Sequence, residues 1–383
     1  MPHGRHQIIG AVGQKLRPES LEVTEMVDPR LRRIIGRETR IPSMRWSLIA
    51  VFGSFALAGL LPCASALTIS GSVFQGSPAP GGGTFSTLES ASLNDNGAIA
   101  FVADVSGATA SQGVFLVYKG AVTSALLQGS AVPGGGTFSA FDSVSLNDGG
   151  VVAFVADVSG GASGQGLFLI NKSTVTAVVL QGSPAPGGGT FSTFESASLN
   201  NNGAIAFVAD ISGGTASQGI FLINKGAVTA VALQGSLAPG GGTFSAFDSV
   251  SLNDSAVIAF VADVSGGTAS QGIFLINKGT VTAAVLQGSP APGSGTFSTF
   301  ESASVNNNGA IAFVADIGGG TASQGLFLIN KGKVNAVALQ GSPAPGGGTF
   351  AAFESASLSN NGGIAFVADV SGGTANQGIF FSS

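Results

Sequence analysis

The chain has 383 residues, enough for one large domain or two ordinary ones, and a formal net charge of −5. Beyond residue 46 it holds six Lys, no Arg and 15 acids, a net charge of −9, which excludes nucleic-acid binding by that part. Both His, Trp46 and Cys63 precede residue 67, so the remainder has no thiolate nucleophile, no imidazole base and neither of the usual zinc ligands, His and Cys.

The first 66 residues have the features of a leader. Residues 1–43 are polar and rich in Arg, and we interpret them as a disordered extension or as a misassigned start, with Met44 the true initiator. Residues 44–66 are predicted to be a signal peptide, since a basic start and an apolar stretch precede Ala-Ser-Ala, with cleavage after Ala66. The alternative is an uncleaved membrane anchor, because residues 46–66 carry no charge. We expect export to the periplasm, the cell surface or the exterior, with membrane contact only through this segment.

From residue 67 onward the chain is one 53-residue unit in six copies. The tripeptide Gln-Gly-Ser starts at Gln75, Gln128, Gln181, Gln234, Gln287 and Gln340. The tetrapeptide Phe-Val-Ala-Asp starts at Phe101, Phe154, Phe207, Phe260, Phe313 and Phe366. Repeats of this length indicate a solenoid, a propeller or an array. We predict that residues 67–383 form one repeat domain.

Each copy contains four short runs with the composition of β-strands. In the third copy they span residues 191–199, 204–211, 219–223 and 227–233, and they are rich in Val, Ile, Phe and Thr. The second and third runs are apolar on both faces, which is typical of a sheet covered on both sides. Asn and Gly between the first and second runs, and between the third and fourth, favour tight hairpin turns.

Four antiparallel strands repeated six times predict an all-β fold, a six-bladed β-propeller. The ends of the chain support a closed ring. Residues 67–74 match a fourth strand without its first three, and residues 378–382 match a third strand without its fourth. We expect the N-terminal strand to complete the last blade. The alternative is an outer-membrane β-barrel of 24 short strands, for which the strands lack apolar–polar alternation and aromatic girdles.

A short motif within the copies resembles a known family. Asn-x-x-Gly-x-x-Ala-Phe starts at Asn94, Asn147, Asn200 and Asn306, while Ala256 replaces the Gly of one copy and Ser359 the Asn of another. In this the chain is similar, over residues 67–383, to the exported bacterial NxxGxxAF tandem-repeat proteins with varied surface anchors. The resemblance implies secretion and a repeat fold, and it supplies no activity.

One series of acids lies on the first strand of the copies. It consists of Glu89, Asp142, Glu195, Asp248, Glu301 and Glu354. With the first strand innermost, six carboxylates would line a central channel and repel one another unless solvated, protonated or bound to cations. This gives the hypothesis of a channel that binds Ca²⁺ or a cationic ligand. The alternative places the acids on blade flanks, bonded to neighbouring loops.

A second series of acids ends the second strand of each copy. It consists of Asp104, Asp157, Asp210, Asp263, Asp316 and Asp369. These carboxylates could form a cation-binding rim, or each could accept hydrogen bonds from the loop that follows it. Residues 94–97, Asn-Asp-Asn-Gly, superficially resemble a calcium loop but lack its spacing and distal Glu, and a hairpin turn is predicted there.

These features led us to expect a structural or surface-interaction protein without catalysis. Six nearly identical copies offer no unique asymmetric pair of carboxylates for hydrolysis. We expect no catalytic residue, metal ligand or cofactor, and an unknown extracellular or surface partner. The alternative was a multivalent module that binds carbohydrate or cations through its loops.

Overall fold

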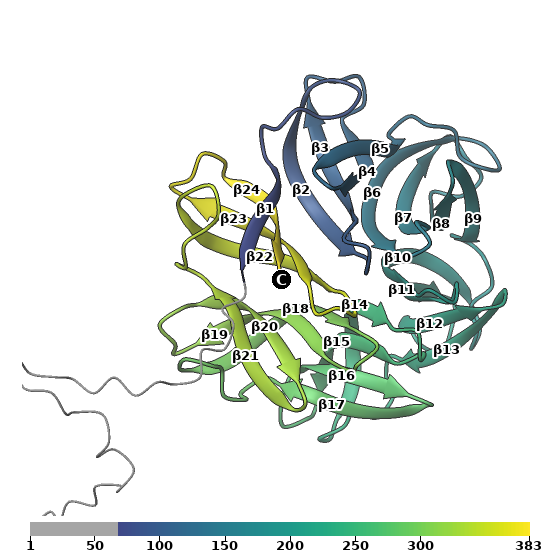
Figure 1. Ribbon diagram of the computed structural model, residues 1–383. Helices are drawn as coiled ribbons and strands as arrows, with labels where there is room; N and C mark the ends of the chain where they lie inside the picture. Colours follow the sequence, from purple (N-terminus) through teal and green to yellow (C-terminus); the bar gives the residue numbers. More distant parts are fainter. Residues whose placement is uncertain (1–67) are drawn as a thin grey trace, which may run out of the picture. The chain divides into compact units, whose positions relative to one another are not determined.

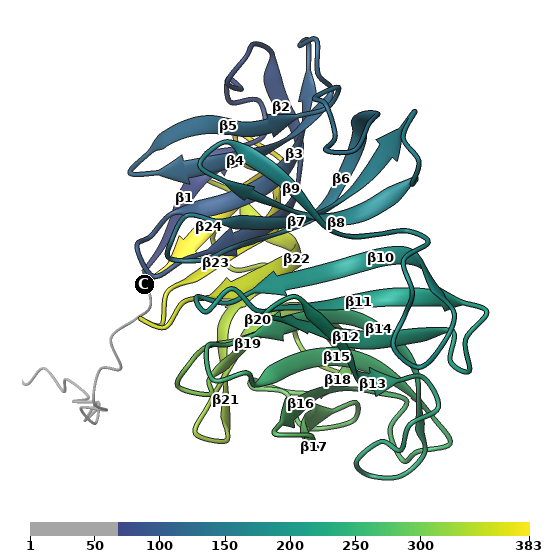
Figure 2. The same ribbon diagram turned by 90° about the vertical axis from the view of Figure 1, so that its right-hand side faces the viewer.

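The computed structural model describes residues 68–383, which form six four-stranded antiparallel sheets arranged as the blades of a ring (Figure 1). Figure 2 shows the blades turned by 90°. The prediction of a six-bladed β-propeller is confirmed. The predicted extension over residues 1–43 and the predicted signal peptide over residues 44–66 lie outside the described residues. From residue 68 to residue 383, no helix has the length and apolar character needed to cross a bilayer.

The strands follow the 53-residue repeat. Blade 1 consists of β2 (Thr84–Leu93), β3 (Ile99–Ser106), β4 (Gln112–Tyr118) and β5 (Ala121–Leu127). Blade 2 consists of β6 (Thr137–Leu146), β7 (Val152–Ser159), β8 (Gln165–Asn171) and β9 (Thr174–Leu180). Blade 3 consists of β10 (Thr190–Leu199), β11 (Ile205–Ser212), β12 (Gln218–Asn224) and β13 (Ala227–Leu233). Blade 4 consists of β14 (Thr243–Leu252), β15 (Ile258–Ser265), β16 (Gln271–Asn277) and β17 (Thr280–Leu286). Blade 5 consists of β18 (Thr296–Val305), β19 (Ile311–Gly318), β20 (Gln324–Asn330) and β21 (Lys333–Leu339). Blade 6 consists of β22 (Thr349–Leu358), β23 (Ile364–Ser371), β24 (Gln377–Ser382) and β1 (Ile69–Phe74).

The first strand of each copy is the inner strand of its blade. It contacts the inner strands of both neighbouring blades, and the circle closes where β2 contacts β22. The inner strand of blade 3 pairs with β11 in a register that slips twice, between Phe191 and Thr193 and between Phe194 and Ser196. These bulges bring Phe191 and Phe194 to the same buried side and leave Glu195 outside the ladder, since a bulge re-aims the local side chain.

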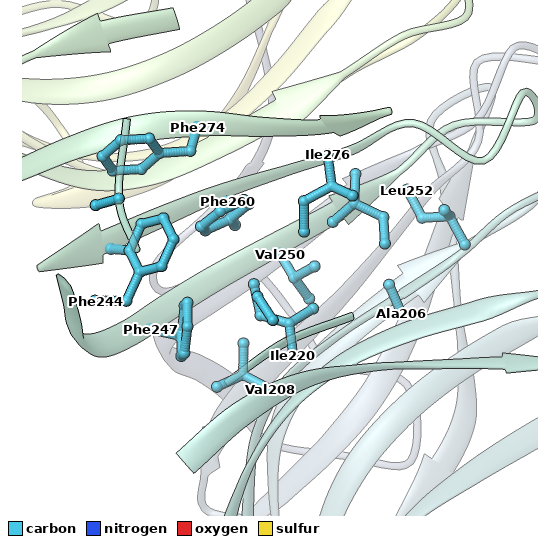
Figure 3. Close-up of a cluster of buried hydrophobic side chains, with 14 of the residues drawn as sticks. Ala206, Val208, Ile220, Phe244, Phe247, Val250, Leu252, Phe260, Phe274 and Ile276 are labelled. Atoms are coloured by element: carbon cyan, nitrogen blue, oxygen red, sulfur yellow. The ribbon is translucent and has the colours of Figure 1, made fainter. Parts of the chain in front are cut away.

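The hydrophobic core lies between the blades. Figure 3 shows Val208 and Ile220 of blade 3 facing Phe247 and Val250 of blade 4. Within blade 4 the ring of Phe244 meets the ring of Phe274 edge-on, at 5.0 Å between centroids. Five further clusters repeat this arrangement around the ring. Each blade therefore buries its two apolar faces only when it has a neighbour on each side.

A circle of hydrogen bonds joins the inner strands. In each blade a Ser hydroxyl accepts from a backbone N–H of the next blade, as Ser198 Oγ does from Leu252 at 2.9 Å. The six accepting residues are Ser92, Ser145, Ser198, Ser251, Ser304 and Ser357. Since Ser357 accepts from Leu93, the circle is complete across the junction of blades 6 and 1. These bonds fix the register of one blade against the next.

The two ends of the described chain meet in blade 6, as predicted. Strand β1 pairs antiparallel with β24 from Ile69 opposite Ser382 to Phe74 opposite Gly378. We call the junction of blades 6 and 1 the seam. Its residues depart from the other copies, since Phe381 stands where blade 3 has Leu and Gly363 where blade 3 has Ala. The two changes belong together, because a Cβ on residue 363 would lie 2.8 Å from the Phe381 ring.

Deleting residues 67–78 should destabilise the ring, because it removes β1 and exposes the unpaired edge of β24 in the blade-6 core. We expect the Tm to fall by about 10 °C or more, since a domain of this size shifts by about 2–4 °C per kcal/mol. Circular dichroism melts would measure the change.

The control for this deletion restores the strand at the other end of the chain. Residues 67–74 are appended after Ser383 through an Asn-Lys-Gly turn, the turn that joins the third and fourth strands of blade 3. This permutant should regain the lost stability. A deletion variant that melts like the full chain would contradict the closure.

Candidate functional site

Two circles of polar side chains surround the centre of the ring. The first is formed by the turns that follow the inner strands. Its members are Asp95, Asp148, Asn201, Asp254, Asn307 and Asn360. Each donates its backbone N–H to the side-chain oxygen of the next member, and Asn360 donates to Asp95 at 2.7 Å. The cavity that the turns enclose has a volume of about 70 Å³. The space at this circle is therefore small, and its polar groups are largely used within the fold.

Hydrogen bonding also sets the electrostatics of this circle. Burial acts to raise the pKa of Asp254, but bonds from Asn307 and Asn201 outweigh it and hold the pKa below its ordinary value. The Asn94 side chain accepts from the N–H groups of Asn96 and Ala98, so residues 94–97 form the predicted hairpin turn. We assign this circle a structural role.

The second circle holds the carboxylates of the inner strands. In blade 3 the Gln218 amide donates to both oxygens of Glu195, at 3.0 and 3.2 Å. The Gln218 carbonyl oxygen accepts from the backbone N–H of Phe247 in the next blade, at 2.7 Å. The equivalent Gln of every other blade accepts such a bond, and Gln377 takes it from Leu88 across the seam at 2.6 Å. A buried amide thus ties blade 3's carboxyl group to its neighbour.

The bulged carboxyl groups hold protons more tightly than exposed ones. In all six blades burial raises the pKa of the inner-strand acid, and the negative charge of the Asp on the second strand raises it further, against the opposing effect of the Gln bond. The pKa of Glu354 is raised to about 7, since repulsion from Glu301 and Glu89 adds to these effects. Burial also raises the pKa of Asp369.

The two predicted series of acids are therefore partners within each blade. The inner strand is the first strand, as expected, and every Glu or Asp on it interacts with the Asp 15 residues further on. Asp210 accepts from Thr193 Oγ1 at 2.6 Å, a partner on the inner strand rather than in the loop that follows. Sequence reasoning treated the series separately and overlooked Gln218, although a Gln recurs 23 residues after each inner-strand acid.

The described residues bear on the calcium hypothesis as well. Within residues 68–383, no three His, Cys, Asp or Glu side chains lie close enough to hold a metal ion together. The second circle contains pairs of carboxyl groups beside Gln amides, and such pairs can transfer protons.

One of the carboxyl pairs lines an open hollow at the seam. Glu354 and Asp369 lie in it together with Gln377, and it is also lined by Gln75, which directly follows β1, and by Ser86 of blade 1. The hollow has a volume of about 560 Å³. The Gln377 amide donates to Glu354 Oε1 at 2.8 Å. A small molecule in this hollow would meet both carboxyl groups.

A family model covers nearly all of the repeats. Residues 59–216 and 212–383 match the DUF7453 family, which is described as a family of unknown function. The chain belongs to the DUF7453 family. This membership does not test the resemblance to the NxxGxxAF repeat proteins, which stays a prediction. No curated protein matches the sequence significantly.

Solved structures share the propeller fold at low sequence identity. A gluconolactonase from Xanthomonas campestris is 9% identical with a TM-score of 0.45, over 82% of this chain and 89% of its own. Regucalcin from Agrobacterium tumefaciens, a calcium-binding protein, is 13% identical with a TM-score of 0.42, over 82% and 93% of the two chains. A luciferin-regenerating enzyme is 7% identical with a TM-score of 0.43, over 83% and 95%. These likenesses concern the fold alone.

The expectation of a protein without catalysis is corrected by these structures. A rigid repeat body predicts a purely structural or binding role, yet a gluconolactonase and a luciferin-regenerating enzyme are among the solved propellers. The six carboxyl pairs are also not all alike, because blade 6 alone combines an inner-strand Glu, Glu354, with Ala352. We therefore do not retain the non-catalytic assignment.

The raised pKa of Glu354 predicts that stability depends on pH. The folded state binds a proton more tightly than the unfolded state, so its stability is fully present below about pH 4.5 and is lost as pH rises through about 7. We expect a higher Tm at pH 5 than at pH 8. Glu354→Gln should reduce this difference by raising the Tm at pH 8.

The matched control for this prediction is Glu195→Gln in blade 3. Glu195 is repelled by one carboxylate of a neighbouring blade, whereas Glu354 is repelled by two. The control should therefore change the pH dependence less, as calorimetry at several pH values would show. An equal effect of the two substitutions would contradict the assignment of the strongest shift to Glu354.

Proposed function

We propose that this protein is a hydrolase that cleaves a neutral ester or lactone by acid–base catalysis with a Glu/Asp pair of the second circle. The observation that carries the proposal is the pairing of two carboxyl groups, one on the inner strand and one on the second strand, with burial and mutual repulsion raising a pKa toward neutrality. In such a pair one group can hold a proton while the other is ionised.

The charge of the circle favours an uncharged substrate. The chain beyond residue 46 has a net charge of −9, and the carboxylates are concentrated at this circle, so an anionic substrate would be repelled. Hydrolysis of an ester or lactone converts a neutral molecule into a carboxylate. The same repulsion would then expel the product, an advantage that glycoside hydrolysis, with its neutral products, would lack.

The reaction requires one water molecule and two proton transfers. The ionised carboxylate accepts a proton from water as the water oxygen bonds to the carbonyl carbon. The protonated carboxyl gives its proton to the alkoxide oxygen as the carbon–oxygen bond breaks. The products are a carboxylic acid and a hydroxyl group. The proton is then on the former base, and its transfer back to the former acid restores the starting state of the pair.

Export belongs to the proposal on sequence grounds alone. The basic start, apolar stretch and Ala-Ser-Ala sequence of residues 44–66 support a secreted or surface-attached enzyme, as does the resemblance to the NxxGxxAF repeat proteins. A surface or extracellular partner stays a prediction. Residues 67–383 contain no Cys, so their fold does not depend on the redox state of the compartment.

The proposal is tested by assaying the purified chain on δ-gluconolactone and p-nitrophenyl acetate at pH 7, with acid release from the lactone followed by pH-stat and p-nitrophenolate followed by absorbance. A variant with all six inner-strand acids changed to their amides should lose about a hundredfold or more of the rate, the usual contribution of a general acid or base. Amides preserve shape and carry no charge that burial would disfavour, so the Tm should not fall.

The control for this assay is Asp148→Asn in the first circle, where three blades already carry Asn. It removes one negative charge without touching the second circle, and activity should be kept. A chain that hydrolyses neither substrate, or a six-amide variant as active as the natural chain, would refute the proposed function.

A further inference from the structure

The six carboxyl pairs are not equivalent, and the residue opposite the second-strand Asp distinguishes them. Blades 1, 3 and 5 combine an inner-strand Glu with Thr at this position, and blades 2 and 4 combine an inner-strand Asp with Ala. Blade 6 alone combines Glu with Ala, as Glu354 with Ala352 opposite Asp369. The residues opposite the Asp are Thr87, Ala140, Thr193, Ala246, Thr299 and Ala352.

In two of the three blades that carry this threonine, its hydroxyl donates a hydrogen bond to the Asp of the second strand. Thr193 Oγ1 donates to Asp210 Oδ2 and Thr299 Oγ1 to Asp316 Oδ2, each at 2.6 Å. A carboxylate oxygen engaged by a short hydroxyl bond is a weaker base toward water. Ala352 has no hydroxyl, so nothing of this kind engages Asp369.

The inner-strand acid must also reach the hollow. In blade 2 the corresponding hollow, of about 440 Å³, is lined by Asp157 and Gln165 but not by Asp142, whose side chain is one methylene shorter than that of Glu. In blade 6 both Glu354 and Asp369 line the hollow. Only blade 6 combines an inner-strand Glu with a residue that has no hydroxyl opposite the Asp, although Thr87 of blade 1 makes no bond to Asp104 either.

The hollow at the seam has one amide group more than the hollow of blade 2, since Asn376 lines it where blade 2 has Gly164. Asn376 stands where blade 3 has Ser217, whose hydroxyl donates to the linking Gln234. At the seam the linking residue is Gln75, which donates to the Ser86 carbonyl at 2.8 Å and lines the hollow with Asn376. Two amides beside two carboxyl groups provide donors and acceptors for a hydroxylated substrate.

We propose that the hollow at the seam is the reactive site of the ring, with Glu354 as the general acid, Asp369 as the general base and Gln377 as a positioning residue. This inference rests on the proposed function and selects one pair of the six. Gln377 is 5% exposed and bonds both to Glu354 and to Leu88 of blade 1, so ring closure orients the acid. The substrate class is a neutral, hydroxylated ester or lactone.

A reactive pair of this kind can be detected without knowing the substrate. We would treat the full chain at pH 7 with glycidol, a small neutral epoxide, and locate the label by mass spectrometry. An Asp369 oxygen would bond to an epoxide carbon as the ring carbon–oxygen bond breaks, and the ring oxygen would take the Glu354 proton to become a hydroxyl. We expect the label on Asp369.

Two substitutions add or remove the threonine hydroxyl opposite the second-strand Asp. Ala352→Thr should engage Asp369 and abolish its label, and Thr193→Ala should free Asp210 and produce a label there beside Glu195. Glu354→Gln should abolish the Asp369 label, whereas Glu195→Gln should leave it.

Gln377→Met should slow labelling at Asp369, and Gln377→Glu, which can still bond both partners when protonated, should recover labelling as pH falls.

The outcomes separate this inference from the proposed function. Label spread evenly over the six blades, or an Asp369 label that survives Ala352→Thr and Glu354→Gln, would overturn the assignment of blade 6, even if the chain hydrolyses lactones. A label confined to Asp369 in a chain that hydrolyses no ester or lactone would refute the proposed function and keep the reactive pair. With both intact, Ala352→Thr should lower kcat about a hundredfold while Tm is kept.

Discussion

The structure depends on the fact that no blade can bury its own surface. Strands such as β11 and β12 are apolar on both faces, and neither face has a second layer within the same 53-residue copy. Only a neighbouring blade can cover these faces. A row of such blades would leave an apolar face exposed at each end, and closing the row into a ring removes both ends. For this reason the two ends of the described chain share one sheet, in which β1 pairs with β24.

Closure also shapes the chemistry of the inner strands. The bulges that turn Phe191 and Phe194 to the same side leave a Glu outside the ladder, and the buried Gln that ties the blades together holds that Glu by its other end. Packing and electrostatics are thus coupled, since the side chains that set the register between blades also fix where the protons reside. At the seam this coupling joins residues nearly 300 positions apart, as in the bond from Leu88 to Gln377.

Most of the fold could be predicted from the sequence because the period of 53 residues and the strand patterns are strong and regular. The inner position of the first strand and the pairing of the two ends were predicted correctly for the same reason. The site was predicted only in part. The acids on the inner and second strands were identified as two series, but bulges at Ser192 and Glu195 change which side chains meet, and these bulges have no distinct pattern in a strand of alternating residues. The distinction of blade 6 was visible in Ala352 and Asn376, yet their meaning required the hydrogen bonds that Thr193 and Ser217 make in blade 3.

The paired change at Gly363 and Phe381 bears on how such a gene can gain or lose repeats. Recombination between near-identical copies would insert or remove whole 53-residue units, and the internal copies are interchangeable because each offers its neighbours the same surfaces. The final copy is different, since its phenylalanine ring leaves no room for the alanine of an ordinary copy. A crossover that separates these two positions would place a Cβ against an aromatic ring at the one junction that joins the ends. Blade number can therefore drift in the interior of the gene, while its last segment has to be inherited intact.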